Sequence, residues 1–216
     1  MSLEMKSIKA AIQEMRNKSP KRNFEQSVEL IINLSGVDVK KPEERIQETV
    51  ELPRPIGKKV KVAVIASGDM ALRARKAGAD LVLEGSDLEG LATDKKKQRK
   101  IANEVDAFIA SAPLMPLVGR TLGAILGPRN KMPTPVPPTA NIEEEIERHR
   151  RIVQIRARGQ PVLQCRIGTE SMADDDLAEN IQAVINKLRG RLKRGLSDIG
   201  GVFIKTTMGP PVEIRI

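Results

Sequence analysis

The spacing of apolar residues along this chain predicts two kinds of β-strand. In residues 27–34 (SVELIINL) apolar side chains stand mainly at every second position, which is typical of a strand buried on one face. Residues 60–66 (VKVAVIA) are almost wholly apolar, which is typical of a parallel strand buried on both faces. The pattern changes at residues 53–57 (PRPIG), so we expect a second architecture to begin near residue 54.

Further patterns complete both parts of the chain. Apolar residues recur at helical spacing in residues 5–15 and in 177–192, the second run behind a predicted cap at Asp174. More strands of the first kind are expected at residues 46–52, 153–157, 161–168, 201–207 and 211–216. Strand–helix pairs are expected at 60–66 with 70–77, 79–83 with 94–105, and 107–111 with 114–126, followed by a proline-rich loop and a charged helix at about 141–151.

These elements predict a mixed fold, α/β and α+β, in two domains. Strands of the first kind lie at both chain ends, so residues 1–53 and 152–216 are expected to form one discontinuous α+β domain. Residues 54–151 are expected to form an inserted, Rossmann-like, three-layer α/β domain. The two crossing segments, near 53–57 and 153–159, would then form a hinge.

The charge of the chain indicates an acidic partner. The formal net charge is +9 and the sequence pI is near 9.8, which favours nucleic acid or an anionic membrane surface. With the bounds predicted above, the terminal parts hold 19 basic and 16 acidic residues and the insert 18 and 12, so we expect the insert to be more basic. No apolar run approaches the roughly 18 to 20 residues of a membrane helix, and no signal peptide core is present, so we expect a cytoplasmic protein without a membrane partner.

Few residues are available for catalysis or for a cofactor. Cys165 and His149 are the only cysteine and the only histidine, and a pair between them would have to cross the predicted domain boundary. The turn at residues 66–70 (ASGDM) has one glycine where a dinucleotide turn uses three, and Asp69 would repel phosphate there. The aspartates at 174–176 suit the positive end of a helix dipole better than a metal ion. We therefore predict no enzyme activity, no cofactor and no metal.

Two polar segments are candidates for binding RNA. The run at residues 94–100 (DKKKQRK) either grips phosphates or presents a solvated helix face, and the sequence leaves both open. The segment 205–211 (KTTMGPP) reads as a hairpin turn, yet a solvent turn does not explain two hydroxyls and a methionine at its tip. Hydroxyls and bare backbone bind 2′-hydroxyl groups and phosphates, and Met lies flat on a base, so we expect RNA contacts from Thr206, Thr207, Met208 and Gly209.

The start of the first strand has similar chemistry, because Phe24 offers a ring for stacking and Ser27 a hydroxyl. The chain has no Trp, no Tyr and three Phe, so it cannot build an extended stacking platform for single-stranded bases. If it binds RNA, we expect it to read folded shape and backbone.

Four stretches resemble the ribosomal protein L-one family, the large-subunit protein of the mobile rRNA stalk beside the tRNA exit site. They are residues 23–30 (NFEQSVEL), 122–133 (LGAILGPRNKMP), 176–181 (DLAENI) and 205–210 (KTTMGP), and their order and separation match as well. The resemblance covers nearly the whole chain. It implies two domains, with an inserted Rossmann-like second domain and the main RNA site in the terminal domain.

The resemblance also implies site residues. Phe24 and Ser27 match the family's strand-start contacts, Thr207, Met208 and Gly209 match its C-terminal turn contacts, and Gly168 matches a further loop near the RNA. Bacterial members carry lysine where Asn23 stands, and the chain also has Asn33 near the end of that strand, so Lys40, Lys41 or Arg166 are expected to supply phosphate contacts instead. With these departures from the bacterial members, the chain resembles an archaeal-type member of the family.

The function implied is that of a structural constituent of the large ribosomal subunit that binds its rRNA. The resemblance further implies help in releasing tRNA from the exit site, repression of translation through binding of its own mRNA, and a monomer when free of the ribosome. Two rivals stay open on the sequence alone: an α/β enzyme with a nucleotide cofactor, and a non-ribosomal RNA-binding regulator of the same fold.

Overall fold

The computed structural model describes residues 4–37, 41, 46–57, 59–157 and 159–215. The chain has a mixed α/β fold with antiparallel and parallel sheets, and it divides into two compact units. The terminal unit comprises Met1–Lys58 and Arg151–Ile216, and the inserted unit comprises Lys59–Arg150. The first crossing between the units thus lies five residues later than the sequence pattern placed it, and the second lies one residue earlier.

This shift of boundary changes where the positive charge lies. Arg54, Lys58 and Arg151 pass to the terminal unit, which then holds 22 basic and 16 acidic residues, against 15 and 12 in the inserted unit. The expectation that the insert is more basic is therefore wrong for these units. The two boundary shifts move six residues from the insert to the terminal unit, and three of these six residues are cations.

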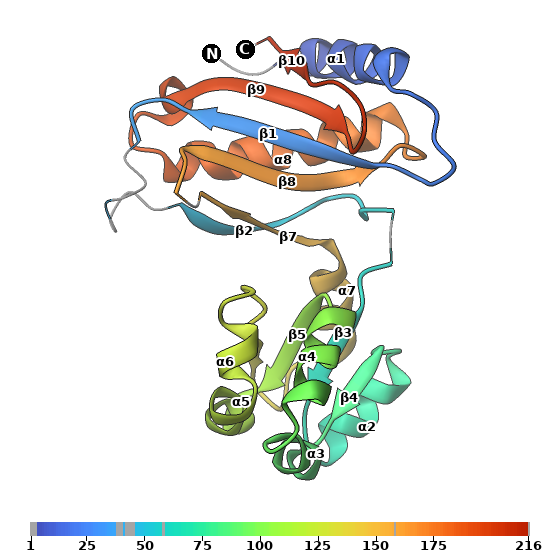
Figure 1. The fold of residues 1–216 in the computed structure, drawn as a ribbon, viewed down its shortest axis with the longest axis vertical. Coiled ribbons are helices and arrows are strands. Elements are labelled where there is room, and N and C mark those ends of the chain that lie inside the picture. The colour runs from blue at the N-terminus through green and yellow to red at the C-terminus, as the bar shows by residue number, and fades with distance from the viewer. Residues whose placement is uncertain (1–3, 38–40, 42–45, 58, 158, 216) are drawn as a thin grey trace. The chain divides into compact units, whose positions relative to one another are not determined.

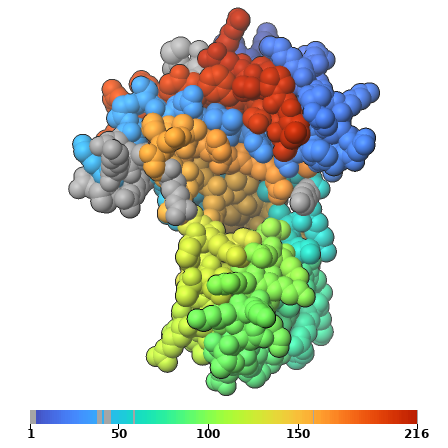
Figure 2. Space-filling model, viewed as in Figure 1, coloured from blue at the N-terminus to red at the C-terminus, as the bar shows by residue number. Residues whose placement is uncertain are grey.

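A four-stranded antiparallel sheet, in the order β10-β9-β1-β8, forms the centre of the terminal unit (Figure 1). Its strands are β1 (Ser27–Leu34), β8 (Val162–Thr169), β9 (Ile199–Thr206) and β10 (Val212–Ile214). Alternate residues of β1 are buried, as the sequence pattern predicts for a strand covered on one face. Both chain ends supply this sheet, and Figure 2 shows atoms of the first and last segments side by side on the unit's surface.

Two helices, α1 (Met5–Lys18) and α8 (Asp174–Arg191), pack against each other and supply apolar residues to the core of this unit. Three successive aspartates at the start of α8 each pair with a different cation: Asp174 with Arg16, Asp175 with Lys9 and Asp176 with Arg54. Asp174 is the first residue of the helix, and the N-cap is Ala173, so the predicted cap at Asp174 is wrong by one position. The ion pairs attach α1 and the first crossing segment to α8.

A second, two-stranded antiparallel sheet joins the strands that flank the two crossings, β2 (Gln47–Glu51) and β7 (Ile152–Arg156). The register pairs Glu51 with Ile152, so the chain enters and leaves the terminal unit at the same end of this ribbon. The second suggested hinge segment, 153–159, therefore begins inside a hydrogen-bonded pair, whereas the first, 53–57, begins just after β2 ends.

A parallel sheet in the order β4-β3-β5-β6 organises the inserted unit. Its strands are β3 (Val62–Ile65), β4 (Leu81–Leu83), β5 (Ala107–Ser111) and β6 (Thr134–Val136). Its helices are α2 (Asp69–Lys76), α3 (Gly85–Leu91), α4 (Lys95–Glu104), α5 (Met115–Thr121), α6 (Gly123–Leu126) and α7 (Ile142–Arg151), the last ending at the crossing. One apolar core joins β3 and β5 to α3, α4, α5 and α6.

Two elements of the inserted unit were absent from the sequence prediction. β6 lies within the proline-rich loop, where Pro135 stands on an edge strand beside Ala110 and so needs no partner for a missing N–H. α3 is held by a capping box between Glu84 and Asp87. No helix in the described ranges is both long and apolar enough to cross a membrane.

Candidate nucleic-acid interface

Most of the predicted site residues meet at one end of the antiparallel sheet. β1 begins where its neighbours β8 and β9 end, because both pairs are antiparallel: Ser27 lies opposite Thr169, and Val28 opposite Thr206. The turn after β9 and the loop before β1 therefore lie side by side. This arrangement brings together Phe24, Ser27, Gly168, Thr206, Thr207, Met208 and Gly209.

A buried glutamine, Gln26, holds this end of the sheet together. Its side chain is fully buried, and its Oε1 accepts a hydrogen bond from the backbone N–H of Met208 at 3.0 Å. Its Nε2 donates to the carbonyl of Pro20 at 2.9 Å and to Oε2 of Glu170 at 3.2 Å. Because buried amides are stable only when their hydrogen bonds are formed, Gln26 fixes the turn after β9 relative to the loops before β1 and after β8.

The threonines of the C-terminal turn also bond within the protein. Thr207 donates from its backbone N–H to the carbonyl of Ser27 at 3.0 Å, and its hydroxyl accepts from the N–H of Ser27 at 3.2 Å. The hydroxyl of Thr206, a buried residue, lies 2.7 Å from that of Ser19. Thr206 thus positions the end of α1, whereas Thr207 is exposed and its hydroxyl, which already accepts one bond, can accept a second.

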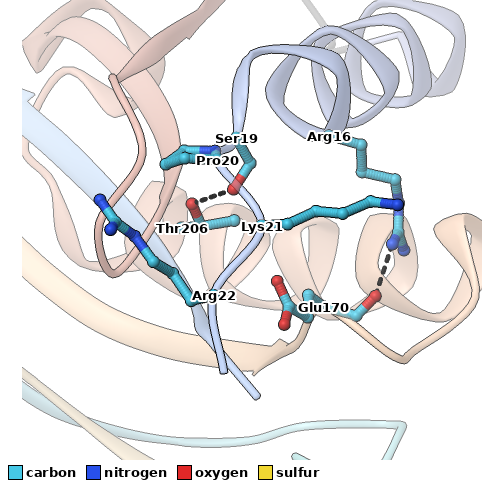
Figure 3. A pocket seen from close by; sticks show the side chains of 7 residues that line it. All are labelled: Arg16, Ser19, Pro20, Lys21, Arg22, Glu170 and Thr206. Carbon is cyan, nitrogen blue, oxygen red and sulfur yellow. Dashed lines mark hydrogen bonds between the residues drawn. The ribbon is translucent and has the colours of Figure 1, made fainter. Parts of the chain in front are cut away.

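A pocket of about 340 Å³ lies beside this turn, and its walls come from the end of α1, the following loop, β9 and the loop after β8 (Figure 3). Its lining residues are Arg16, Ser19, Pro20, Lys21, Arg22, Glu170 and Thr206. Among the described residues, exposed Lys21 and Arg22 have no acidic partner, whereas Arg16 is held by Asp174 and by carbonyls of the loop. The rim therefore offers two free cations to an anion.

Two carboxylates lie near these cations: Glu170, which lines the pocket, and Glu25, which precedes Gln26 in the chain. Glu170 accepts from the backbone N–H of Gln26 at 3.1 Å, and Glu25 accepts a hydrogen bond from the hydroxyl of Ser171. That bond, with a weaker one from Thr169, lowers the pKa of Glu25, so it is ionised at neutral pH. Ionised carboxylates repel phosphates but accept from 2′-hydroxyl and base amino groups, so the rim has partners for both backbone and base edges.

Two large apolar side chains project beside this polar rim. Phe24 is 52% exposed and Met208 is 54% exposed, and they are two of only four large hydrophobic residues with such exposure in the described part of the chain. Gln26 stands two residues from Phe24 and binds the N–H of Met208, so both side chains rise from a backbone that the buried network holds. A ring and a thioether held in this way provide surfaces on which bases can stack.

Gly168 and Gly209 occupy crowded positions rather than open ones. A Cβ on Gly168 would come within 2.5 Å of Sδ of Met172 and 2.6 Å of Cδ2 of Leu177, and the residue is buried. A Cβ on Gly209 would come within 2.3 Å of Oγ1 of Thr206, although Gly209 itself is partly exposed. The structure thus gives Gly168 a packing role near the end of β8, and its expected place near the RNA stays a prediction.

The expected phosphate cations do not join this cluster. Arg166 lies on the more exposed face of β8, beside Glu29 of β1 and three residues before the end of the strand. Lys41 is exposed but follows the far end of β1, and a strand of eight residues spans about 23 Å. Lys40 lies outside the described residues. Lys21 and Arg22, which were not among the expected cations, line the pocket instead.

The sequence analysis missed Gln26, Glu170, Lys21 and Arg22. A basic pair directly before Asn23 was the available signal for the two cations. No signal in the sequence marked Gln26, because its partners at residues 170 and 208 are brought near only by the fold.

No nucleophilic pair is formed by Cys165 and His149. Burial raises the pKa of the Cys165 thiol to about 12, so it is neutral and unreactive in the folded chain. His149 is buried in the inserted unit, with Nδ1 2.8 Å from the carbonyl of Glu145 and Nε2 3.0 Å from the hydroxyl of Thr134. Both ring nitrogens therefore have structural partners, and the residue stabilises the contact between α7 and β6.

The turn at residues 66–70, which leads from β3 into α2, has the features of the sequence that oppose nucleotide binding. Gly68 adopts φ 59° before α2, and Asp69 in the first turn pairs with Arg73 of the same helix. A carboxylate at this helix start opposes phosphate binding. No group of three or more His, Cys, Asp or Glu suitable for a metal ion occurs in the described ranges.

Fold and site together define a mixed α/β protein with a polar recognition surface built from both chain ends, and without paired catalytic groups in its described part. The model of the Ribosomal protein L1p/L10e family matches residues 14–210, and the chain belongs to this family. It is 48% identical to the large ribosomal subunit protein uL1 of Methanobrevibacter smithii, over 94% of this chain and 96% of the relative. Identity to the proteins of the same name is 47% in Pyrococcus horikoshii, over 100% of this chain and 98% of the relative, and 46% in Thermococcus kodakarensis, over the whole of both.

Family membership confirms three predictions from the sequence. The resemblance to the L-one family and to its archaeal members is confirmed, since these relatives are archaeal. Because the family consists of ribosomal proteins, the chain is a structural protein and not an enzyme, which rules out the nucleotide-dependent rival. Its location is the ribosome in the cytoplasm.

Proposed function

We propose that the chain is a component of the large ribosomal subunit that binds a folded region of its rRNA with the strand-end surface of the terminal unit. The observation that supports this most is the exposure of Phe24 and Met208 above a fully buried hydrogen-bond network centred on Gln26. Phe24 and Met208 would stack on bases, Lys21 and Arg22 would bind phosphates, and Glu170 would accept from base or 2′-hydroxyl groups. A rigid surface of this kind recognises RNA by fit.

The proposal includes the domain organisation expected from the sequence. The terminal unit would be the rRNA-binding domain, and the inserted unit would be a Rossmann-like, three-layer domain with its own core. The parallel order β4-β3-β5-β6, with helices between successive strands, supports that description.

A binding isotherm with a stalk rRNA fragment tests the rRNA site. Replacing Phe24 and Met208 together by Ala should weaken binding by roughly 2 to 6 kcal/mol, since each base stack contributes about 1 to 3 kcal/mol. The matched control replaces Leu72 and Met132, which are 56% and 44% exposed in the inserted unit, and should stay within about threefold of the wild type. Equal affinity of the wild type and the Phe24–Met208 variant would refute the site.

The same surface would serve two further roles that the family resemblance implies. An mRNA leader that presents the fold of the rRNA site would compete for it, which would repress translation of the chain's own message. In the ribosome, the chain would assist release of tRNA from the exit site, and free of the ribosome it would be a monomer. Competition between leader and rRNA fragment should be lost equally in the Phe24–Met208 variant, and sedimentation of the free protein measures its mass.

A further inference from the structure

Two lysines of α4 in the inserted unit are neutralised within their own helix. Nζ of Lys97 lies 3.5 Å from Oδ2 of Asp94, and Nζ of Lys100 lies 3.9 Å from Oε1 of Glu104. In a helix with 3.6 residues per turn, Lys97, Lys100 and Glu104 fall on one flank of the exposed face. This flank carries pairs of opposite charge.

The other flank of the exposed face carries only cations. Lys95, Lys96 and Arg99 are exposed, and none of them has an acidic partner in the described part of the chain. The helical period places Lys95, Arg99 and Asn103 in one row along α4, with Lys96 between this row and Lys100. The flank from Lys95 to Asn103 extends for about 12 Å.

A neighbouring loop extends this flank. Oδ1 of Asn103 accepts a hydrogen bond from Nη1 of the exposed Arg129 at 2.6 Å, and an amide leaves the guanidinium charge in place. Lys131 donates to the carbonyls of Ala102 and Val105 at 3.0 and 2.6 Å, so a further cation stands at the end of α4. We call Lys95, Lys96, Arg99 and Arg129 the cationic stripe.

The helix that presents the stripe is firmly held. Asp94 caps it by accepting from the backbone N–H groups of Lys96 and Lys97, both at 3.0 Å. On the inner side, buried Gln98 donates to the carbonyl of Leu91 at 2.7 Å. These contacts fix both the start and the inner face of α4. The backbone of the helix is therefore already ordered before binding, and ordering it adds little entropic cost.

We propose that the cationic stripe binds the sugar–phosphate backbone of double-helical RNA without reading its sequence. Lys95, Arg99 and the Asn103-bound Arg129 follow one row that matches a repeating line of phosphates, Lys96 stands beside that row, and no large apolar residue is exposed on α4 to form the centre of a protein interface. The stripe also lacks the aromatic and hydroxyl groups that read bases in loops. The stripe lies in the inserted unit and is separate from the proposed rRNA site. The proposal rests on the proposed function only in taking RNA as the polyanion that the stripe binds.

Two double variants of the full chain provide a matched test, because each removes two charges from the same helix. Lys96→Gln with Arg99→Gln changes the stripe, and Lys97→Gln with Lys100→Gln changes the paired flank. Fluorescence anisotropy would follow binding of a labelled, mixed-sequence RNA hairpin over a series of KCl concentrations. Circular dichroism would verify that both variants keep their helix content, as expected since Lys, Arg and Gln all favour helices.

The stripe variant should raise the Kd for the hairpin about five- to twentyfold at low salt and lower the slope of log K against log salt by roughly 1.5 to 2. The flank variant should raise Kd less than about threefold. Equal weakening of both would show attraction to net charge alone, and an unchanged Kd in the stripe variant would show no contact; either outcome overturns the proposal. Affinity for the stalk rRNA fragment, which depends on Phe24 and Met208 in the other unit, reports separately on the rRNA site.

Discussion

The side-chain amide of Asn180 pairs with the backbone of Arg54 in both directions. Its Oδ1 accepts from the N–H of Arg54 at 3.0 Å, while its Nδ2 donates to the carbonyl of Arg54 at 3.3 Å and to that of Ile167 at 2.8 Å. Asn180 is fully buried in α8. It thereby attaches the first crossing segment to the core of the terminal unit, at a place where the sequence suggested a hinge.

Replacing Asn180 by Ala should lower the free energy of unfolding of the terminal unit by about 2 to 4 kcal/mol, because the buried carbonyl of Ile167 and the partly buried backbone groups of Arg54 lose their partner. Replacing Arg54 by Ala keeps that backbone and removes only the exposed pairs with Asp176 and Glu179, so its effect should stay below about 1 kcal/mol. Urea unfolding followed by far-ultraviolet circular dichroism measures both, since the chain has no Trp or Tyr for fluorescence. Similar losses in the two variants would contradict the role of the amide.

Gln26 should affect RNA binding without contacting RNA. A Gln26→Leu variant leaves the N–H of Met208 and the carbonyl of Pro20 without their partner, so we expect a loss of about 2 to 3 kcal/mol in stability. Affinity for the rRNA fragment should also fall, because the turn that carries Met208 is no longer fixed. Gln164 of β8 is exposed, and Gln164→Leu controls for the substitution itself. If Gln26→Leu kept wild-type affinity at a temperature where it is folded, the network would not position the site.

The regular elements were predictable because burial repeats with the period of the element. The strand expected at 27–34 is β1 with the same bounds, and the helix expected at 5–15 runs from Met5 to Lys18. β6 escaped prediction because three residues carry no period and two prolines surround them. α3 escaped because its seven residues include two glycines, and a capping box rather than a long apolar stripe marks it.

The site was predictable only where a residue's own chemistry was unusual. Phe24 and Met208 stood out as apolar residues in polar turns, and the structure leaves both exposed. Gln26 and Asn180 read as ordinary polar residues in the sequence, yet both are fully buried. Their function depends on partners more than 120 positions away, at residues 54, 170 and 208, which no local pattern encodes.

Asp80 should make the stability of the inserted unit depend on pH. Partial burial by itself would raise the pKa of Asp80, but the N–H of Val62, the ammonium of Lys59 and the guanidinium of Arg150 outweigh burial and lower it. A lowered folded-state pKa stabilises the unit above the unfolded value of about 4, and this stabilisation is lost as pH falls through the folded value. Lys59 and Arg150 are the first and last residues of the unit, so Asp80 joins its two ends.

We therefore expect Asp80→Asn to lower stability by about 1 to 2 kcal/mol at pH 7, with the deficit shrinking below about pH 4. Asn can still accept from Val62, so the variant isolates the effect of charge. Urea unfolding at pH 7 and at pH 3 measures the difference between wild type and variant at each pH. A deficit of the same size at both pH values would mean that geometry, and not ionisation, is responsible.

A substitution at Gly168 can distinguish a role of this residue in packing from a role in RNA contact. A methyl group there meets Met172 at 2.5 Å and Leu177 at 2.6 Å, so Gly168→Ala should destabilise the terminal unit by about 1 to 3 kcal/mol. Gly190 in α8 has open space around its Cβ position, and Gly190→Ala should instead stabilise by up to about 1 kcal/mol. Where both variants are folded, their affinities for the stalk rRNA fragment should lie within about threefold of the wild type. A Gly168→Ala variant with native stability and weakened rRNA binding would return Gly168 to the RNA surface, because only a group at that surface changes affinity without changing the core.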